Sequence, residues 1–127
     1  MKAETIIEEE KEEIEYNEYL ERVMKLTEGK KMKCGNFCID QKESLKTDAP
    51  DGEYPIIEKA YYYDFIVKTD TLVKVQDGYI DVSSLIDATD EWMLKAKQDR
   101  NSPSDHYWLE RVWYDKKCQS IRIEFGS

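Results

Sequence analysis

The sequence predicts an α+β protein with a long acidic N-terminal helix, an antiparallel β-meander, one further amphipathic helix and a C-terminal β-hairpin. Residues 3–28 are mostly strong helix formers and include neither Gly nor Pro. Residues 61–82 and 106–125 alternate apolar and polar side chains around short turn signals, as half-buried strands do. A chain of 127 residues suits one domain with a substantial core. We therefore expect an acidic helical arm over residues 1–28 and a single α+β domain over residues 29–127.

The first predicted helix is about 25 residues long and ends at Gly29, which we expect at the C′ position. Residues 1–22 contain nine Glu against three basic residues, so they carry −6 of the net charge of −9. The apolar stripe expected to pack on the domain contains Tyr16, Tyr19, Leu20, Val23 and Leu26. Ile7 and Ile14 fall on nearly the opposite side of the helix. Either the first turns are simply solvated, or Ile6, Ile7 and Ile14 contact another chain.

Two shorter features follow this helix. Residues 31–40 predict a small hairpin around Gly35-Asn36. Residues 40–54 are polar and contain Pro50-Asp51-Gly52, so we expect one long loop that is either mobile or used for binding. The basic cluster of Lys25, Lys30, Lys31 and Lys33 is expected to compensate the acidic arm and the carbonyl end of the helix, rather than to bind phosphate.

The predicted meander is organised by two turns. A two-residue turn at Asp77-Gly78 pairs Val75 with Ile80, and a three-residue turn at 69–71 pairs Phe65 with Val75. One face of these strands then carries Tyr61, Tyr63, Phe65, Val67, Val73, Val75, Ile80 and Val82.

The second predicted helix begins with a capping-box-like pattern from Ser84 to Asp87. Its buried stripe is expected to contain Leu85, Ala88, Trp92, Met93 and Ala96.

The C-terminal hairpin is predicted to turn through a three-residue loop over residues 115–117. This register sets Leu109 opposite Ile123 and collects the large apolar pairs on one face, whereas a loop one residue longer or shorter would set Leu109 against a charged residue. The second face then carries Trp108, Glu110, Val112 and Tyr114. This face is either covered by the first helix or used as a binding surface.

Residue types alone would allow a Cys3His zinc site built from Cys34, Cys38, His106 and Cys118. The predicted hairpin separates His106 from Cys118 by roughly 27 Å, so we expect no metal. His106 is the only histidine, and nothing in the sequence sets a Ser or Cys nucleophile beside it. No glycine lies in a phosphate-binding motif. We therefore expect no cofactor and no enzymatic activity, and keep a small enzyme with carboxylate chemistry as a distant alternative.

The net charge of the chain indicates which classes of partner it can bind. A net charge of −9 disfavours nucleic-acid phosphate and favours a basic protein partner. There is no secretory signal pattern and no apolar run long enough for a membrane span. Three cysteines, an odd number, favour reduced thiols. We expect a cytoplasmic chain that contacts neither membrane nor nucleic acid.

These observations favour a non-enzymatic protein-interaction module whose acidic arm binds another protein. One form would be an inhibitor or immunity-type protein that occupies a basic surface. The alternative is a structural subunit of a larger assembly, such as a viral particle, that associates with further copies of itself. The candidate partner-binding residues are Ile7, Glu10, Glu13, Ile14, Tyr62, Trp108, Val112 and Tyr114.

Overall fold

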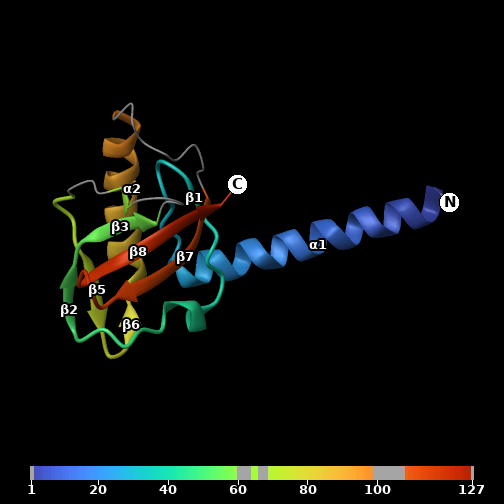
Figure 1. Ribbon diagram of the computed structural model, residues 1–127. Coiled ribbons are helices and arrows are strands. Elements are labelled where there is room, and N and C mark those ends of the chain that lie inside the picture. Colours follow the sequence, from blue (N-terminus) through green and yellow to red (C-terminus); the bar gives the residue numbers. More distant parts are fainter. Residues whose placement is uncertain (1, 60–63, 66–68, 99–107, 127) are drawn as a thin grey trace.

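The computed structural model describes residues 2–59, 64–65, 69–98 and 108–126. The elements follow in the order α1 (Lys2–Leu26), β1 (Asn36–Phe37), a 3-10 helix (Lys42–Leu45), β2 (Gly52–Tyr54), β3 (Ile56–Lys59), β4 (Asp64–Phe65), β5 (Val73–Gln76), β6 (Tyr79–Ile80), α2 (Val82–Gln98), β7 (Trp108–Asp115) and β8 (Ser120–Gly126). One sheet has the strand order β1-β7-β8-β3-β4, and a smaller one has the order β2-β5-β6. Figure 1 shows α2 lying behind the larger sheet and α1 projecting away from the domain. The predicted α+β class is confirmed.

Helix α2 supplies one wall of the core. All five residues of its predicted apolar stripe are buried, and the ring of Trp92 lies 5.7 Å from that of Phe125 on β8. The core continues through buried side chains of both sheets and of the segments between them, namely Phe37, Ile39, Leu45, Ala49, Ile56, Val73, Val75, Ile80, Leu109, Val112, Ile121 and Ile123. The apolar period of 3.6 residues in this segment therefore identified the buried face of α2 correctly.

The start of α2 lies earlier than predicted. Asp81, not Ser84, is the N-cap residue, because the Ser84 N–H donates to the Asp81 carboxylate over 2.9 Å. The Ser84 hydroxyl in turn donates to the Asp81 carbonyl and accepts the N–H of Lys74 on β5. This network ties the first turn of α2 to the smaller sheet.

The smaller sheet is antiparallel, as expected of the meander, and the predicted pairing of Val75 with Ile80 is confirmed. The pairing of Phe65 with Val75 is wrong. Val75 pairs with Gly52 on β2, and Phe65 pairs with Glu58 in the larger sheet. The remaining predicted strand residues, 61–63 and 67, lie outside the described residues.

The larger sheet is mixed, because two of its pairings are parallel. Strand β1 pairs in parallel with β7, setting Phe37 against Leu109, and β3 pairs in parallel with β8. A local hairpin over residues 31–40 was therefore a wrong prediction. Phe37 and Ile39 are instead buried in the common core.

The polar segment between β1 and β2 is packed onto the domain rather than forming an open loop. Leu45 and Ala49 are buried in the core. The backbone N–H of Thr47 donates to the carbonyl of Gly78 over 2.9 Å, and the N–H of Asp77 donates to the carboxylate of Asp51 over 2.9 Å. This segment is thus hydrogen-bonded to the β5–β6 turn instead of forming an open loop, and its use for binding stays a prediction.

The β7–β8 hairpin is present, but its predicted register is wrong. Asp115 pairs with Ser120, so the loop has four residues, and Val112 rather than Leu109 lies opposite Ile123. A β-bulge between Leu109 and Arg111 shifts the register again, so that Leu109 faces Phe125. The bulge allows Leu109 and Val112, three residues apart, to enter the same core.

Candidate protein-interaction surface

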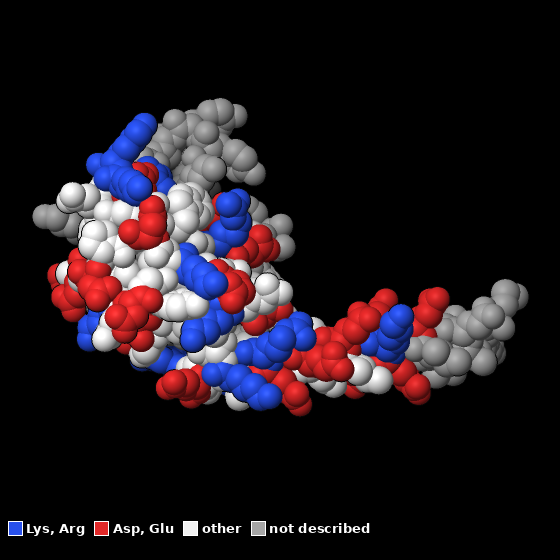
Figure 2. Space-filling view, turned by 90° about the horizontal axis from the view of Figure 1, so that it is seen from below, with Lys and Arg blue, Asp and Glu red and all other residues white. Residues whose placement is uncertain are grey.

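The most prominent surface feature is the part of α1 that extends beyond the domain, residues 8–18, which we call the arm (Figure 1). These residues carry seven Glu and one Lys, a net charge of −6. All the arm residues are exposed, and the side chain of Ile14 is 58% exposed. Figure 2 shows acidic side chains along the arm, with basic ones gathered where it meets the domain. The arm is thus an acidic helix with an unburied apolar residue.

The C-terminal end of α1 is closed by a Schellman-type arrangement. The Gly29 N–H donates to the Met24 carbonyl over 2.9 Å, and the Glu28 N–H donates to the Lys25 carbonyl. Glu28 has a φ of 54° and therefore occupies the left-handed C′ position, while Gly29, predicted at C′, follows it with a φ of 79°. Two successive left-handed residues turn the chain back toward the domain immediately after the helix.

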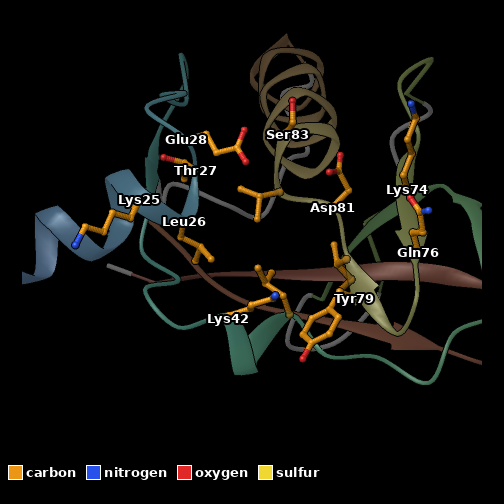
Figure 3. A pocket seen from close by; sticks show the side chains of 13 residues that line it. Lys25, Leu26, Thr27, Glu28, Lys42, Lys74, Gln76, Tyr79, Asp81 and Ser83 are labelled. Carbon is orange, nitrogen blue, oxygen red and sulfur yellow. The ribbon is translucent and has the colours of Figure 1, made fainter.

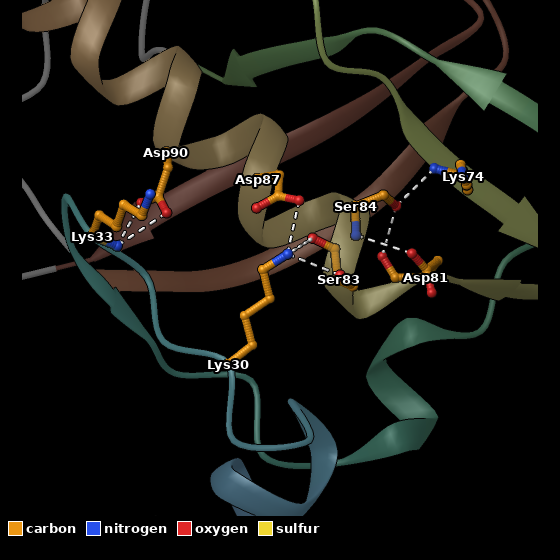
Figure 4. Close-up of polar contacts among 8 residues, drawn as sticks. All are labelled: Lys30, Lys33, Lys74, Asp81, Ser83, Ser84, Asp87 and Asp90. Atoms are coloured by element: carbon orange, nitrogen blue, oxygen red, sulfur yellow. Dashed lines mark hydrogen bonds and ion pairs between the residues drawn. The ribbon is translucent and has the colours of Figure 1, made fainter.

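Charged side chains of α2 hold the segment that follows this turn (Figure 4). Lys30 Nζ contacts the Asp87 carboxylate at 2.7 Å and donates to the Ser83 hydroxyl at 2.9 Å. One turn further along α2, the Asp90 carboxylate accepts the backbone N–H groups of Lys33 and Cys34 at 2.9 and 3.0 Å. The segment that follows α1 is therefore joined to α2 by several charge-assisted contacts.

A further ion pair lies nearer the arm. Arg22 on α1 contacts the Asp40 carboxylate at 3.2 Å, so the helix is linked to the segment after β1 as well. Val23 and Leu26 pack against the core. Of the stripe predicted to dock on the domain, these two residues do so, Tyr19 is half-buried, and Tyr16 and Leu20 are exposed.

Beside this base lies an apolar groove of about 360 Å³. Its walls come from one side of α1, from the turn after α1, from β1 and from the start of β7. The lining residues are Tyr16, Tyr19, Leu20, Val23, Met24, Thr27, Gly29, Lys30, Lys31, Met32, Asn36, Phe37, Cys38 and Trp108. Leu20, Met24 and Trp108 are 38%, 51% and 43% exposed, an unusual concentration of accessible large apolar side chains.

Two of the titratable groups that line the groove, Tyr19 and Cys38, have raised pKa values. Burial raises the pKa of Tyr19 above its ordinary value of 10.0, and the neighbouring Cys38 adds to the effect. Burial also raises the pKa of the Cys38 thiol above its ordinary value of 9.0. A thiol with a raised pKa is a poor nucleophile at neutral pH, so the groove is suited to contact rather than to covalent chemistry.

A second hollow, of about 670 Å³, lies between the end of α1, the 3-10 helix, strands β5 and β6 and the start of α2 (Figure 3). Its charged lining is mixed, with Lys25, Lys42 and Lys74 against Glu28 and Asp81. Asp81 caps α2, and Lys42 Nζ lies 4.7 Å from the centre of the Tyr79 ring. These side chains serve local structure, and a carboxylate already occupies the helix N-terminus where an anion would bind.

The structure brings together only some of the predicted binding residues. Glu10, Glu13 and Ile14 are exposed on the arm, and Trp108 borders the groove. Val112, by contrast, is 8% exposed and belongs to the core, so its assignment to a binding face is wrong.

Tyr114 is also less accessible than predicted. It is half-buried against the core, with its ring 5.2 Å from that of Tyr54. The cause in both cases is the bulge, which exchanges the two faces of the strand beyond Leu109. The side chain of Ile7 and all of Tyr62 lie outside the described residues.

Sequence reasoning missed the groove. Tyr16, Leu20 and Met24 follow one another at four-residue spacing, which marks one side of a helix. Tyr16 and Leu20 were predicted to pack on the domain together with Tyr19, Val23 and Leu26, and Met24 was not part of that stripe. The partners across the groove, Met32 and Phe37, come from a segment expected to form a separate hairpin.

In the described part of the chain, no three His, Cys, Asp or Glu side chains come together as a metal site would require. Over the same residues, neither helix is long and apolar enough to cross a membrane. Comparisons with known protein families, curated proteins and solved structures found no match. The candidate site is therefore defined by its geometry alone. It consists of the acidic arm, the C-terminal part of α1 that is attached to the domain, and the apolar groove.

Proposed function

We propose that this protein is a non-enzymatic interaction module whose acidic arm binds another protein through a basic surface. The observation that carries the proposal is the exposure of the arm over its whole length, including Ile14. Helices in globular proteins gain most of their stability from packing an apolar face, and the arm has no such packing within the domain. A partner that covers Ile14 would supply it.

The charge of the arm supports a basic partner. A net charge of −6 confined to residues 8–18 creates a strong local field, which accelerates encounter with a positive surface and disfavours acidic ones. An inhibitor or immunity-type protein that covers a basic groove is one form of this function. Binding of this kind weakens steeply as salt is added, because exposed charges are screened over about 8 Å at physiological ionic strength.

The anchoring of the helix base supports the same proposal. Arg22 pairs with Asp40, Lys30 pairs with Asp87 just after the helix, and Val23 and Leu26 pack against the core, so the C-terminal part of α1 is attached to the domain. A helix held in this way loses less orientational freedom on binding than a free peptide would. The domain then acts as the platform that presents the arm.

The direct test is capture of partners from the source organism with two forms of the chain, residues 1–127 and residues 16–127. The shorter form removes most of the arm but keeps Tyr19, Val23 and Leu26, through which α1 packs on the domain. We expect at least one partner to be retained by the longer form alone and released by added salt. If both forms retain the same partners to the same extent, the proposal is wrong.

A matched pair of point variants distinguishes the effect of changing the arm from the effect of changing any exposed apolar side chain. Ile14→Gln changes an exposed aliphatic side chain on the arm, and Leu94→Gln changes one that is equally exposed, at 55%, on α2. Gln is a good helix former, so neither change should disturb its helix. We expect only Ile14→Gln to weaken capture.

A second candidate function, a structural subunit that assembles with its own copies, is favoured by the apolar groove at the base of the arm. For either function we propose a cytoplasmic location, where Cys34, Cys38 and Cys118, all unpaired, would stay reduced.

A further inference from the structure

We infer that the apolar groove receives the arm of a second copy of this chain, so that copies associate head to tail. The inference rests on the proposed function of the arm and names its partner. Both halves of the contact are on the same molecule: an exposed acidic helix at one end and a basic-edged apolar groove at the other.

The groove has the chemistry that an acidic amphipathic helix needs. Its apolar walls include Leu20, Met24 and Trp108, all of them exposed. Lys30 and Lys31 lie at its edge, and Lys31 is exposed to solvent. On the arm, Ile14 is flanked by Glu13 and Glu15, so an apolar side chain can enter the groove while a carboxylate faces Lys31. Lys30 is already paired with Asp87 and adds to the positive edge only in part.

The lengths also correspond. The groove runs beside residues 16–26 of α1, which at 1.5 Å per residue is about 16 Å. The portion of α1 that precedes it, residues 2–15, is about 21 Å long on the same measure. This N-terminal portion of α1, which includes residues 8–15 of the arm, is therefore long enough to lie along the whole of one groove.

The arrangement of apolar residues around α1 decides the symmetry of the contact. Ile14 and Tyr16 are two residues apart, which places them about 200° apart around the helix. Ile14 therefore points away from the side of α1 that lines the groove. A two-fold pair of parallel or antiparallel α1 helices would bury one of these sides and leave the other in water.

A heterologous contact buries both sides. The groove side of α1 in one copy covers the arm of the next, whose own groove remains open to a third copy. Such a contact forms a ring if the rotation closes and an open chain if it does not. Association should therefore continue beyond a dimer.

Sedimentation equilibrium on the full chain at about 1 to 200 µM provides the test. The native chain should show an average mass that rises with concentration past that of two copies, and that falls when salt is raised from about 0.05 to 0.5 M. A chain that stays monomeric over this range, or whose mass stops at two copies, would overturn the inference.

Two variants with complementary defects make the test specific. The arm variant Ile14→Lys puts a positive charge where the arm enters the basic-edged groove, and the groove variant Met24→Glu puts a negative charge where the acidic arm would lie. Each alone should associate at least tenfold more weakly than the native chain. Their equimolar mixture should still form a dimer, because the Met24→Glu copy retains an intact arm and the Ile14→Lys copy retains an intact groove.

The mixed dimer should not grow further, since its remaining arm and groove are both defective. Leu94→Glu, an equally exposed site on α2, should associate like the native chain. Because Ile14 and Met24 are both more than half exposed, both variants should keep the native circular dichroism spectrum and thermal midpoint. Absence of a mixed dimer from two folded variants would overturn the inference.

This outcome is separable from that of the proposed function. If the chain remains monomeric while a host protein is captured only when residues 1–15 are present, the arm binds a different partner and only the inference fails. If association is seen and persists after residues 1–15 are removed, the arm is not the element that enters the groove.

Discussion

Replacing Glu91 by Gln should destabilise the domain by about 2 kcal/mol at pH 7. Glu91 lies on α2, and its carboxylate accepts the N–H groups of Asp70 at 2.6 Å and Thr71 at 2.9 Å. Lys95, one turn later on α2, contacts the same carboxylate at 3.2 Å. The two backbone bonds hold the turn before β5 against the helix, so Glu91 connects two elements that border the core.

The size of the effect follows from the pKa. Burial alone would raise the pKa of Glu91, but the N–H donors of Asp70 and Thr71 lower it from 4.5 to about 2. A shift of this size corresponds to roughly 3 kcal/mol at 1.36 kcal/mol per pKa unit. The side chain is 20% exposed, so solvent screening reduces this to about 2 kcal/mol.

The sign of the pH dependence is fixed by the direction of the shift. Because the folded-state pKa is depressed, the stabilisation is fully present above the unfolded value of 4.5 and is lost as pH falls toward 2. Urea unfolding at pH 7, 4 and 2.5 measures it. The difference in the free energy of unfolding between the native chain and Glu91→Gln should be largest at pH 7 and should decrease steadily below pH 4.5.

A control uses the same substitution at an exposed ion pair. Glu43 contacts Lys46 at 2.7 Å, but its side chain is largely exposed, so Glu43→Gln should leave the unfolding midpoint unchanged. A Glu91→Gln variant as stable as the native chain at pH 7 would refute the reasoning. A difference in the free energy of unfolding that stays constant down to pH 2.5 would also refute it.

Three further predictions concern the core and its caps. Thr89→Val should raise the free energy of unfolding by about 1 kcal/mol, because the buried Thr89 hydroxyl has no hydrogen-bond partner among the described residues; thermal unfolding measures this. Val112→Ala should lower the free energy of unfolding, measured in urea, by about 2 kcal/mol. A change near zero would mean that Val112 lies on the exposed face predicted without the bulge. Asp81→Ala should cost about 1 kcal/mol through loss of the α2 cap, and Asp81→Asn should recover most of it.

Local patterns in the sequence predicted the helices well. The length of α1 follows from a run of helix formers without Gly or Pro, and the buried stripe of α2 follows from apolar residues three and four apart. Both signals can be found within one continuous segment. The pairing of Val75 with Ile80 was also predictable, because the intervening Asp77-Gly78 turn specifies it.

Long-range pairings could not be predicted in the same way. Strand β1 has only two residues and pairs in parallel with β7, some seventy residues later in the chain. Nothing in a segment as short as Asn36-Phe37 records the identity of a distant partner. The groove depends on this pairing, because β1 and the start of β7 supply part of its wall.

The two faces of β7 were assigned wrongly for a recognisable reason, separate from the misplaced turn of the hairpin. A strict two-residue alternation was applied through Leu109-Glu110-Arg111-Val112, where two adjacent charged residues separate two large apolar ones. That spacing of three is a sign of a bulge, since both apolar side chains can be buried only if the strand gains a residue between them. The same oversight placed Val112 and Tyr114 among the candidate binding residues.

Amide hydrogen exchange along α1 tests the central claim most directly, because it reports on the arm and the domain in one experiment. In dilute free chain, residues 8–18 should exchange rapidly while α2, β7 and β8 are protected. When the chain is bound to a captured partner, or concentrated if copies associate, residues 8–18 should become protected, with little change in the rest of the domain. Protection of the arm in dilute free chain, or unchanged exchange there in the bound state, would contradict its role as the binding element.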